Sequence, residues 1–156
     1  MKTIAELTRT NAKSGSVEWI GVRPARREPM DAVDTIDLTI NGVVGDHYQS
    51  AGKRSITLIQ YEHLAVIAAF LGLKAVNPCD LRRNLVVSGI NLLGLRNRQF
   101  RIGNAILEGT GLCAPCSRME EILGTGGYAA VRGHGGITAK IVKAGPVSIS
   151  DAVIPV

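Results

Sequence analysis

Several features that define large protein classes are scarce or missing in this sequence. Aromatic residues make up only 4% of the 156 residues, so the flat side chains on which single-stranded nucleic acids stack are few. No stretch approaches the roughly 18 apolar residues that are needed to cross a bilayer. The first residues, MKTIAELTRTNAKSG, contain no apolar core of an export signal. We therefore predict a cytoplasmic protein with no membrane-spanning segment.

Cysteine is also sparse. Cys79, Cys113 and Cys116 make an odd number in a chain that shows no export signal, which argues against a disulfide framework. Cys113 and Cys116 form one Cys-x-x-Cys pair, but no second pair accompanies it and the three histidines are widely scattered. A structural zinc site, which needs four such ligands, is therefore disfavoured.

The length and the charge of the chain limit the fold and the partner. The chain has the size of one domain, and we expect a single domain over residues 1–156 with its core in about 16–156. Hydrophobic residues make up 46% and charged residues 20%, which is ordinary for a globular protein. The formal net charge of +5 indicates an anionic partner. Because aromatic residues are few, a phosphorylated small molecule is favoured over nucleic acid.

The hydrophobic pattern predicts a mainly β protein. Alternating or β-branched runs, bounded by glycine and proline, predict many short strands. These strands are expected at 16–24, 34–40, 55–60 and 85–87, in a hairpin turned at Gly103-Asn104, and in two or three strands after 136 turned at Gly145-Pro146. One long helix is expected at 61–72 and a short one at 115–124, while 25–33 is expected to be a loop. Many strands and few helices favour a β-barrel.

The segment GTGLCAPCSRMEE can be interpreted in three ways besides zinc binding. A redox pair would need an alternating strand and helix pattern that this chain lacks. Alternatively, Cys116 alone is reactive: in the first turn of a helix opened by Pro115 and near Arg118, its thiolate would be favoured. Such a thiolate could attack sulfur or bind a soft metal. Both cysteines could instead be small buried side chains, which is the common fate of free cysteine.

The segment DLRRNLVVSG places charged donors before a buried strand. The Arg82 and Arg83 guanidinium groups suit a bidentate grip on phosphate or carboxylate. Arg54, which precedes another predicted strand, could extend such a site. The alternative is a solvated basic loop in which one of the two arginines pairs with Asp80.

Two glycine-rich segments could bring the backbone close to a ligand. NGVVGDHYQ lacks the lysine of a phosphate-binding P-loop, and in it Asp46 is interpreted as a turn cap and His47 as a surface residue. The segment RGHGGITAK has three glycines around His134, which imply unusual backbone angles or crowding. Either segment could also be a plain loop.

Taken together and in order, these segments resemble the molybdenum cofactor sulfurase C-terminal (MOSC) family, in particular its small stand-alone bacterial members. The segments that carry the resemblance are WIGVRPARREPM, GVVGDHY, KRSITLIQYEHL, DLRRNLVVSGINLLGL, FRIGNAILEGTGLCAPCSRME, RGHGGITAKIV and the closing SDAV. They cover nearly the whole chain after residue 16. The resemblance implies a β-barrel-rich domain that binds molybdenum cofactor, a pterin that carries a phosphate and a dithiolene-held metal.

The resemblance also implies roles for particular residues. The family's functional cysteine corresponds to Cys116, which would ligate molybdenum or carry sulfur. The family's Arg-x-Asn element corresponds to Arg82 and Asn84, which would contact the phosphate or the pterin, with Arg83 and Arg54 beside them. Any role of Cys113 stays open. Because no lysine-bearing motif or desulfurase segment is present, we expect no pyridoxal phosphate in this chain.

Three hypotheses for the function follow from this resemblance and from the residues. The first is a molybdenum cofactor protein that transfers sulfur from a partner cysteine desulfurase, or reduces an N-hydroxylated substrate with a separate electron donor. The second is a carrier that delivers the cofactor without turnover. The third is a small basic barrel that binds nucleic acid, with an affinity that falls steeply with salt. A homodimer is compatible with all three.

Overall fold

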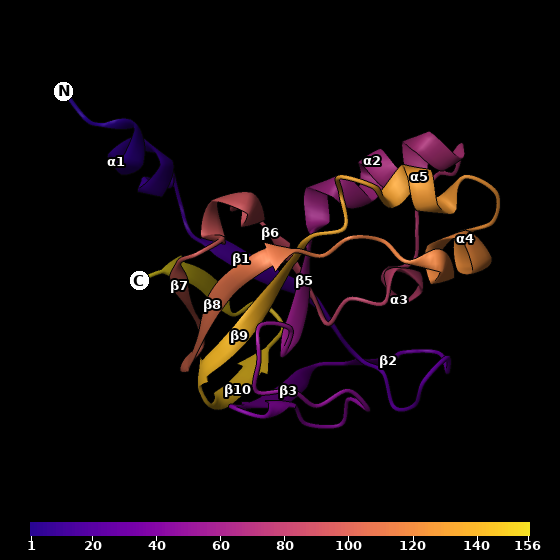
Figure 1. Ribbon diagram of the computed structural model, residues 1–156, viewed down its shortest axis with the longest axis horizontal. Helices are drawn as coiled ribbons and strands as arrows, with labels where there is room; N and C mark the ends of the chain where they lie inside the picture. The colour runs from indigo at the N-terminus through magenta and orange to yellow at the C-terminus, as the bar shows by residue number, and fades with distance from the viewer.

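The structure, a computed structural model, describes residues 1–156 and is built around a closed β-barrel (Figure 1). Its strands are β1 (Gly15–Val22), β2 (Asp31–Val33), β3 (Thr35–Thr39), β4 (Gly42–Val43), β5 (Ile56–Gln60), β6 (Leu85–Ser88), β7 (Gln99–Ile102), β8 (Ala105–Leu112), β9 (Ile137–Lys143), β10 (Gly145–Ser148) and β11 (Ala152–Pro155). The sheet order is β11-β7-β8-β9-β5-β6-β1-β2, and β11 also pairs with β1, which closes the ring. Strands β10, β3 and β4 form a separate small sheet.

Two neighbouring strands of the barrel are buried on both faces. Strands β5 and β6 run parallel, whereas the other pairs are antiparallel. Because side chains alternate along a strand, Leu58 and Leu85 point into the barrel core, and Ile59 and Val86 point into a second core on the outer face. This explains why both sequences read as continuous apolar runs.

The outer core lies beneath a layer of helices. The helices are α1 (Ile4–Arg9), α2 (Tyr61–Leu71), α3 (Pro78–Leu81), α4 (Ser117–Leu123) and α5 (Gly127–Val131), with a 3-10 helix, η1, at Leu92–Leu95. Figure 1 shows α2, α3, α4 and α5 gathered on one side of the barrel. Helix α2 ends at Gly72, whose left-handed backbone (φ +70°) is the usual helix stop. Helices α2, α3, α4 and α5 pack with β5 and β6 around this outer core.

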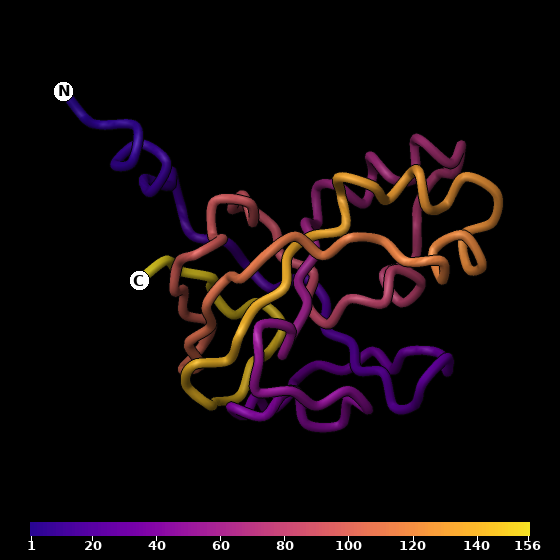
Figure 2. The backbone as a smooth tube through the Cα atoms, viewed as in Figure 1, coloured from indigo at the N-terminus to yellow at the C-terminus, as the bar shows by residue number.

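The amino-terminal helix stands apart from the rest of the chain. Residues 1–10 are all exposed, and the tube in Figure 2 extends away from the barrel at this end. Helix α1 is held locally, because Thr3 and Glu6 each accept a hydrogen bond from the other's backbone N–H. None of the helices is long and apolar enough to cross a membrane.

The structure confirms the mainly β, barrel-type fold class and corrects three local predictions. Residues 31–33 form β2 within the segment that was expected to be a loop. Gly145 and Pro146 lie inside β10 and not in a turn, because β10 pairs there with Leu38 and Asp37 of β3. The short helix begins at Ser117 and not at Pro115. The Gly103-Asn104 hairpin between β7 and β8 and the long helix α2 are as predicted.

Candidate functional site

A cavity of about 360 Å³ opens where the helical layer meets the loop after β1. It is lined by Arg23, Arg26, Arg27, His47, Arg54, Thr57, Arg82, Arg83, Cys113, Ala114, Cys116, Ser117, Arg118 and Met119. Seven of these residues are arginines and none is acidic. We call this space the basic cavity. It therefore brings Cys116, Arg82, Arg83 and Arg54 to one place.

Cys116 is exposed and stands at the entrance to helix α4. It is the N-cap residue and has extended backbone. The prediction that Cys116 lies in the first helical turn is therefore wrong by one position. The helix begins after it because the Met119 N–H donates to the Cys116 carbonyl at 2.9 Å. Its side chain makes no capping hydrogen bond. The thiol is thus accessible and uncommitted, at the wall of a space lined by cations.

Arg82 lines the basic cavity and is the C-cap residue of the short helix α3. Asn77 caps α3 by accepting from the Cys79 N–H at 3.0 Å, and Pro78 occupies the first position of the helix. Arg82 then ends α3 in the left-handed conformation (φ +61°), which costs free energy for a residue other than glycine. Burial, together with the charges of Arg118 and Arg23, lowers the pKa of Arg82, but its guanidinium remains charged at neutral pH.

Arg83 is buried and is bonded only to backbone carbonyls. Its guanidinium donates to the carbonyls of Gly135 (2.8 Å), Leu81 (3.1 Å), Cys113 (3.3 Å) and Ala114 (3.3 Å). Burial lowers the pKa of Arg83, and no carboxylate pairs with it. Arg83 therefore fixes the segment before Cys116 while it leaves a buried positive charge without a counter-ion.

Asn84 lies beneath the basic cavity and does not line it. Its amide nitrogen donates to the Gly21 carbonyl (3.1 Å) and to Asp46 (2.9 Å), and its oxygen accepts from the N–H and the hydroxyl of Thr57. All of these partners belong to the protein. The structure thus places Asn84 as a support for Asp46, whereas the contact with phosphate or pterin implied by the resemblance is not available to it directly.

Asp46 in turn holds Arg23 at the edge of the basic cavity. Arg23 donates to both carboxylate oxygens, at 3.1 and 3.2 Å, and the Tyr48 N–H donates at 3.0 Å. Burial alone would raise the pKa of Asp46, but these hydrogen bonds, the charge of Arg23 and the Asn84 amide outweigh it and lower the pKa. The turn-cap role expected of Asp46 is present, in its bond to Tyr48, and a larger one accompanies it.

The basic cavity carries more positive than negative charge. Asp46 pairs with Arg23, and Glu121 pairs with Arg118 (3.1 Å) and Arg27 (3.7 Å). Four arginines of the lining have no carboxylate within 4.0 Å: Arg26, Arg54, Arg82 and Arg83. Such an excess inside a concave surface attracts anions.

Arg23 is a residue of the basic cavity that the sequence did not identify. The segment WIGVRPARREPM carries part of the family resemblance and Arg118 is expected near Cys116, but no role is predicted for Arg23. The signal that could have identified it is the GDHY turn, because a buried aspartate needs a cationic or donor partner. That partner cannot be named from the sequence, since Arg23 and Asp46 lie 23 positions apart.

The other two cysteines differ from Cys116 in their surroundings. Cys79 is half-buried outside the cavity, and burial, aided by Asp80 and Asp31, raises the pKa of its thiol. Cys113 is only 4% exposed. No three histidine, cysteine, aspartate or glutamate side chains cluster to form a metal site. Cys116 is therefore the exposed thiol of the basic cavity, whereas Cys113, which also lines it, is buried.

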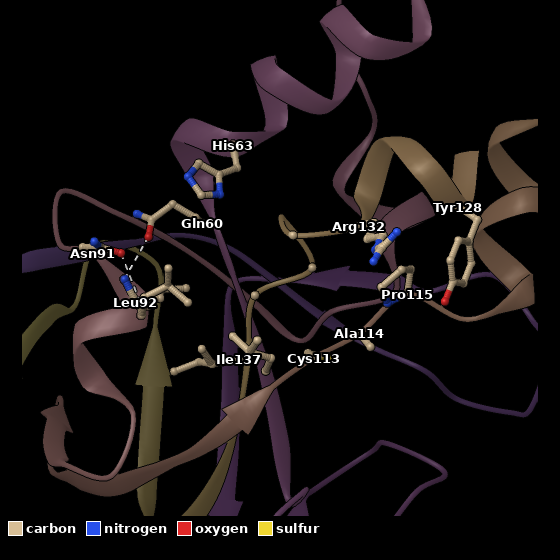
Figure 3. A pocket seen from close by; sticks show the side chains of 15 residues that line it. Gln60, His63, Asn91, Leu92, Cys113, Ala114, Pro115, Tyr128, Arg132 and Ile137 are labelled. Carbon is tan, nitrogen blue, oxygen red and sulfur yellow. Dashed lines mark hydrogen bonds between the residues drawn. The ribbon is translucent and has the colours of Figure 1, made fainter. Parts of the chain in front are cut away.

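A second, larger cavity of about 520 Å³ lies on the other side of the segment before Cys116 (Figure 3). Leu92, Leu93, Leu112, Pro115 and Ile137 supply apolar lining, and Gln60, His63, Asn91, Tyr128 and Arg132 supply polar groups. Cys113 and Ala114 line both cavities. We call this space the apolar cavity and residues 113–114 the dividing segment.

Comparison with solved structures shows the same fold in bacterial proteins. The YuaD protein from Bacillus subtilis is 19% identical, with a TM-score of 0.78 over 90% of this chain and 94% of that one. YiiM from Escherichia coli is 19% identical, with a TM-score of 0.70 over 90% and 69% of the two chains. YiiM from Geobacillus stearothermophilus is 13% identical, with a TM-score of 0.76 over 91% and 75%.

At these identities the likeness concerns the fold alone. No curated protein matches the chain. The model of the MOSC domain family matches residues 42–154, which include Arg54, Arg82, Arg83, Asn84 and Cys116. The chain therefore belongs to the MOSC domain family, which is associated with molybdenum cofactor.

Proposed function

We propose that this protein binds molybdenum cofactor in the basic cavity, with the Cys116 thiolate as ligand to the metal or as carrier of a persulfide sulfur. The observation that carries the proposal is the exposed Cys116 in a cavity whose lining includes four arginines without carboxylate partners. A thiolate is a soft ligand, and guanidinium groups suit a phosphate. Both halves of the cofactor therefore have a matching group.

The chemistry of the residues that line the basic cavity supports this proposal. Arg82 and Arg54 would hold the phosphate, and Arg26 is a further free cation at the same cavity. Arg83 has four of its five N–H donors committed to carbonyls, so its part is to fix the dividing segment and to add positive charge. Asn84 would act as a positioning residue through Asp46 and Arg23. The bound cofactor would supply redox chemistry at molybdenum.

Two reactions suit this arrangement, and a carrier role is the alternative. In the first, a partner cysteine desulfurase would pass a sulfane sulfur to the Cys116 thiolate, which would become a persulfide. Release of that sulfur as sulfide toward the bound cofactor would consume two electrons, from the reduced metal centre or from an electron-donor protein, and would return Cys116 to a thiolate. In the second, an electron-donor protein supplies two electrons, and with two protons they convert an N-hydroxylated substrate to the amine and water. A carrier would retain the cofactor and show neither reaction. A cytoplasmic location would suit each of these partners.

Reconstitution with molybdenum cofactor tests the proposal. We expect wild-type protein to retain both molybdenum and pterin after gel filtration. Molybdenum is measured by inductively coupled plasma mass spectrometry, and the pterin by its fluorescence after oxidation. Cys116→Ala is expected to lower molybdenum retention at least tenfold, since one direct ligand is lost. Cys79→Ala is the matched control, because Cys79 lines neither cavity, and it should retain the cofactor. Equal retention by Cys116→Ala would refute thiolate ligation.

A further inference from the structure

The apolar cavity has the size and lining of a small-molecule site. Its volume of about 520 Å³ lies within the range of ligand pockets, which are mostly apolar with a few placed polar groups. Its rim leaves apolar surface in contact with water, because Leu112 is 56%, Leu93 49% and Tyr128 43% exposed. A ligand with an apolar body would cover this surface and release its water.

A single permanent charge faces this cavity. Arg132 is the only lysine, arginine, aspartate or glutamate in the lining. Its guanidinium forms no salt bridge and no hydrogen bond with the protein. Figure 3 shows Arg132 at the same end of the cavity as Pro115 and Tyr128, with Gln60 and His63 at the opposite end. An unpaired guanidinium beside an apolar wall suits one anionic group on an otherwise apolar molecule.

The polar groups at the opposite end are already engaged or uncharged. The Gln60 side chain donates to the carbonyl of Ile90 (2.9 Å) and accepts from the Leu92 N–H (2.9 Å). His63 lies 3.2 Å from His134, nitrogen to nitrogen, so one ring must donate to a ring nitrogen that carries no proton. Burial and the charge of His134 lower the pKa of His63, which favours its neutral form. Anion recognition therefore belongs to Arg132.

We propose that the apolar cavity binds a small organic anion with an apolar, ring-sized or aliphatic body and one carboxylate or sulfonate, which Arg132 anchors. This site is distinct from the basic cavity, because the dividing segment separates the two and Arg83 holds that segment through the Cys113 and Ala114 carbonyls. The site needs no cofactor. Binding of the organic anion is therefore independent of cofactor binding, although the anion would lie near Cys116.

Paired fluorescent probes test the two halves of this proposal. The probe 1-anilinonaphthalene-8-sulfonate has an apolar body and one sulfonate, and N-phenyl-1-naphthylamine has the same body without charge. We expect wild-type protein to bind both with enhanced fluorescence. Arg132→Gln should weaken the sulfonate probe about tenfold, as for loss of a hydrogen bond to a charged group, and leave the neutral probe unchanged. Leu112→Asp should weaken both probes.

Control variants locate the probe. Arg101→Gln, an exposed arginine on β7 that lines neither cavity, should bind both probes as wild type does. Octanoate should displace the sulfonate probe at about tenfold lower concentration than octanamide, which lacks the charge. The proposal is overturned if Arg132→Gln binds the sulfonate probe as tightly as wild type, or if Arg82→Gln abolishes that binding and Arg132→Gln does not. Unchanged thermal melting of each variant shows that the fold is intact.

Discussion

The two cavities share the dividing segment but have opposite character. The basic cavity is lined by seven arginines, whereas the apolar cavity has one arginine among its 15 lining residues. The difference arises from what lies on each side: the loop after β1 and the end of α3 supply cations to one, and η1, α5 and the end of β8 supply leucines and a tyrosine to the other. One short strip of backbone thus separates a cavity rich in arginine from a mainly apolar one.

The support of the basic cavity should be the most sensitive part of this arrangement. Asp46→Asn removes the charge that pairs with Arg23 and leaves that guanidinium partly buried and unpaired. We expect a loss of about 3 kcal/mol in the free energy of unfolding, measured by urea denaturation. Asp37→Asn, at an exposed position of β3, is the control and should change stability by less than about 0.5 kcal/mol. An equal effect of the two variants would contradict the role given to Asp46.

The loop behind the dividing segment should tolerate no side chain at Gly136. This glycine has φ +84°, and an added Cβ would meet the carbonyl oxygen of Leu58. Gly133 has nearly the same φ, +83°, with open space around it. We expect Gly133→Ala to cost about 1 kcal/mol from backbone strain and Gly136→Ala at least about 2 kcal/mol, measured by urea denaturation. Similar losses would show that crowding does not fix this loop.

A pair of anions should separate the two cavities directly. Arg82→Gln is expected to weaken binding of inorganic pyrophosphate about tenfold, because a charge-assisted hydrogen bond is lost. Arg132→Gln should leave it unchanged, since Arg132 lies on the other side of the dividing segment. Isothermal titration calorimetry at fixed ionic strength measures both. Pyrophosphate affinity that depended equally on the two arginines would mean that the cavities do not discriminate.

The smallest expected effect concerns the histidine pair beside the apolar cavity. The folded-state pKa of His63 lies below its ordinary value of 6.5, so the unfolded chain binds more protons between these two values. The contribution of neutral His63 to the free energy of unfolding is therefore fully present above about pH 6.5. It is lost as the pH falls from there through the folded-state pKa. In the variant His134→Gln, the charge repulsion between His134 and His63, which helps to lower the pKa of His63, is absent. From pH 7.5 to 5.5 we expect Tm to fall about 2 °C less in this variant than in wild type, by scanning calorimetry. An equal fall would contradict the coupling.

Local patterns in the sequence predicted much of the fold. Alternation gave the strand at 34–40, found as β3 at Thr35–Thr39, and helical spacing with Gly72 gave α2. The crowding expected around His134 is confirmed by the positive φ of Gly133 and Gly136 and by the contact that a Cβ on Gly135 would make with the Cys113 carbonyl. Each of these features depends on neighbours along the chain, which explains why the sequence reveals it.

Features that depend on distant residues were not predictable in the same way. Closure of the barrel pairs Gly15 with Val153, and no local pattern encodes that register. The bonds from Asn84 to Asp46 and from Asp46 to Arg23 join three separate segments, so Asn84 was given a contact that its burial does not allow. The apolar cavity was missed because its leucines and Arg132 resemble ordinary surface and core residues until the fold places them together.

Molybdenum-edge X-ray absorption on the reconstituted protein is the most direct test of Cys116 as a ligand. Wild type and Cys116→Ser would be compared, because a hydroxyl is a harder and weaker ligand for this metal than a thiolate. We predict one fewer sulfur atom around molybdenum in Cys116→Ser than in wild type. The same number of sulfur neighbours in both proteins would contradict thiolate ligation by Cys116.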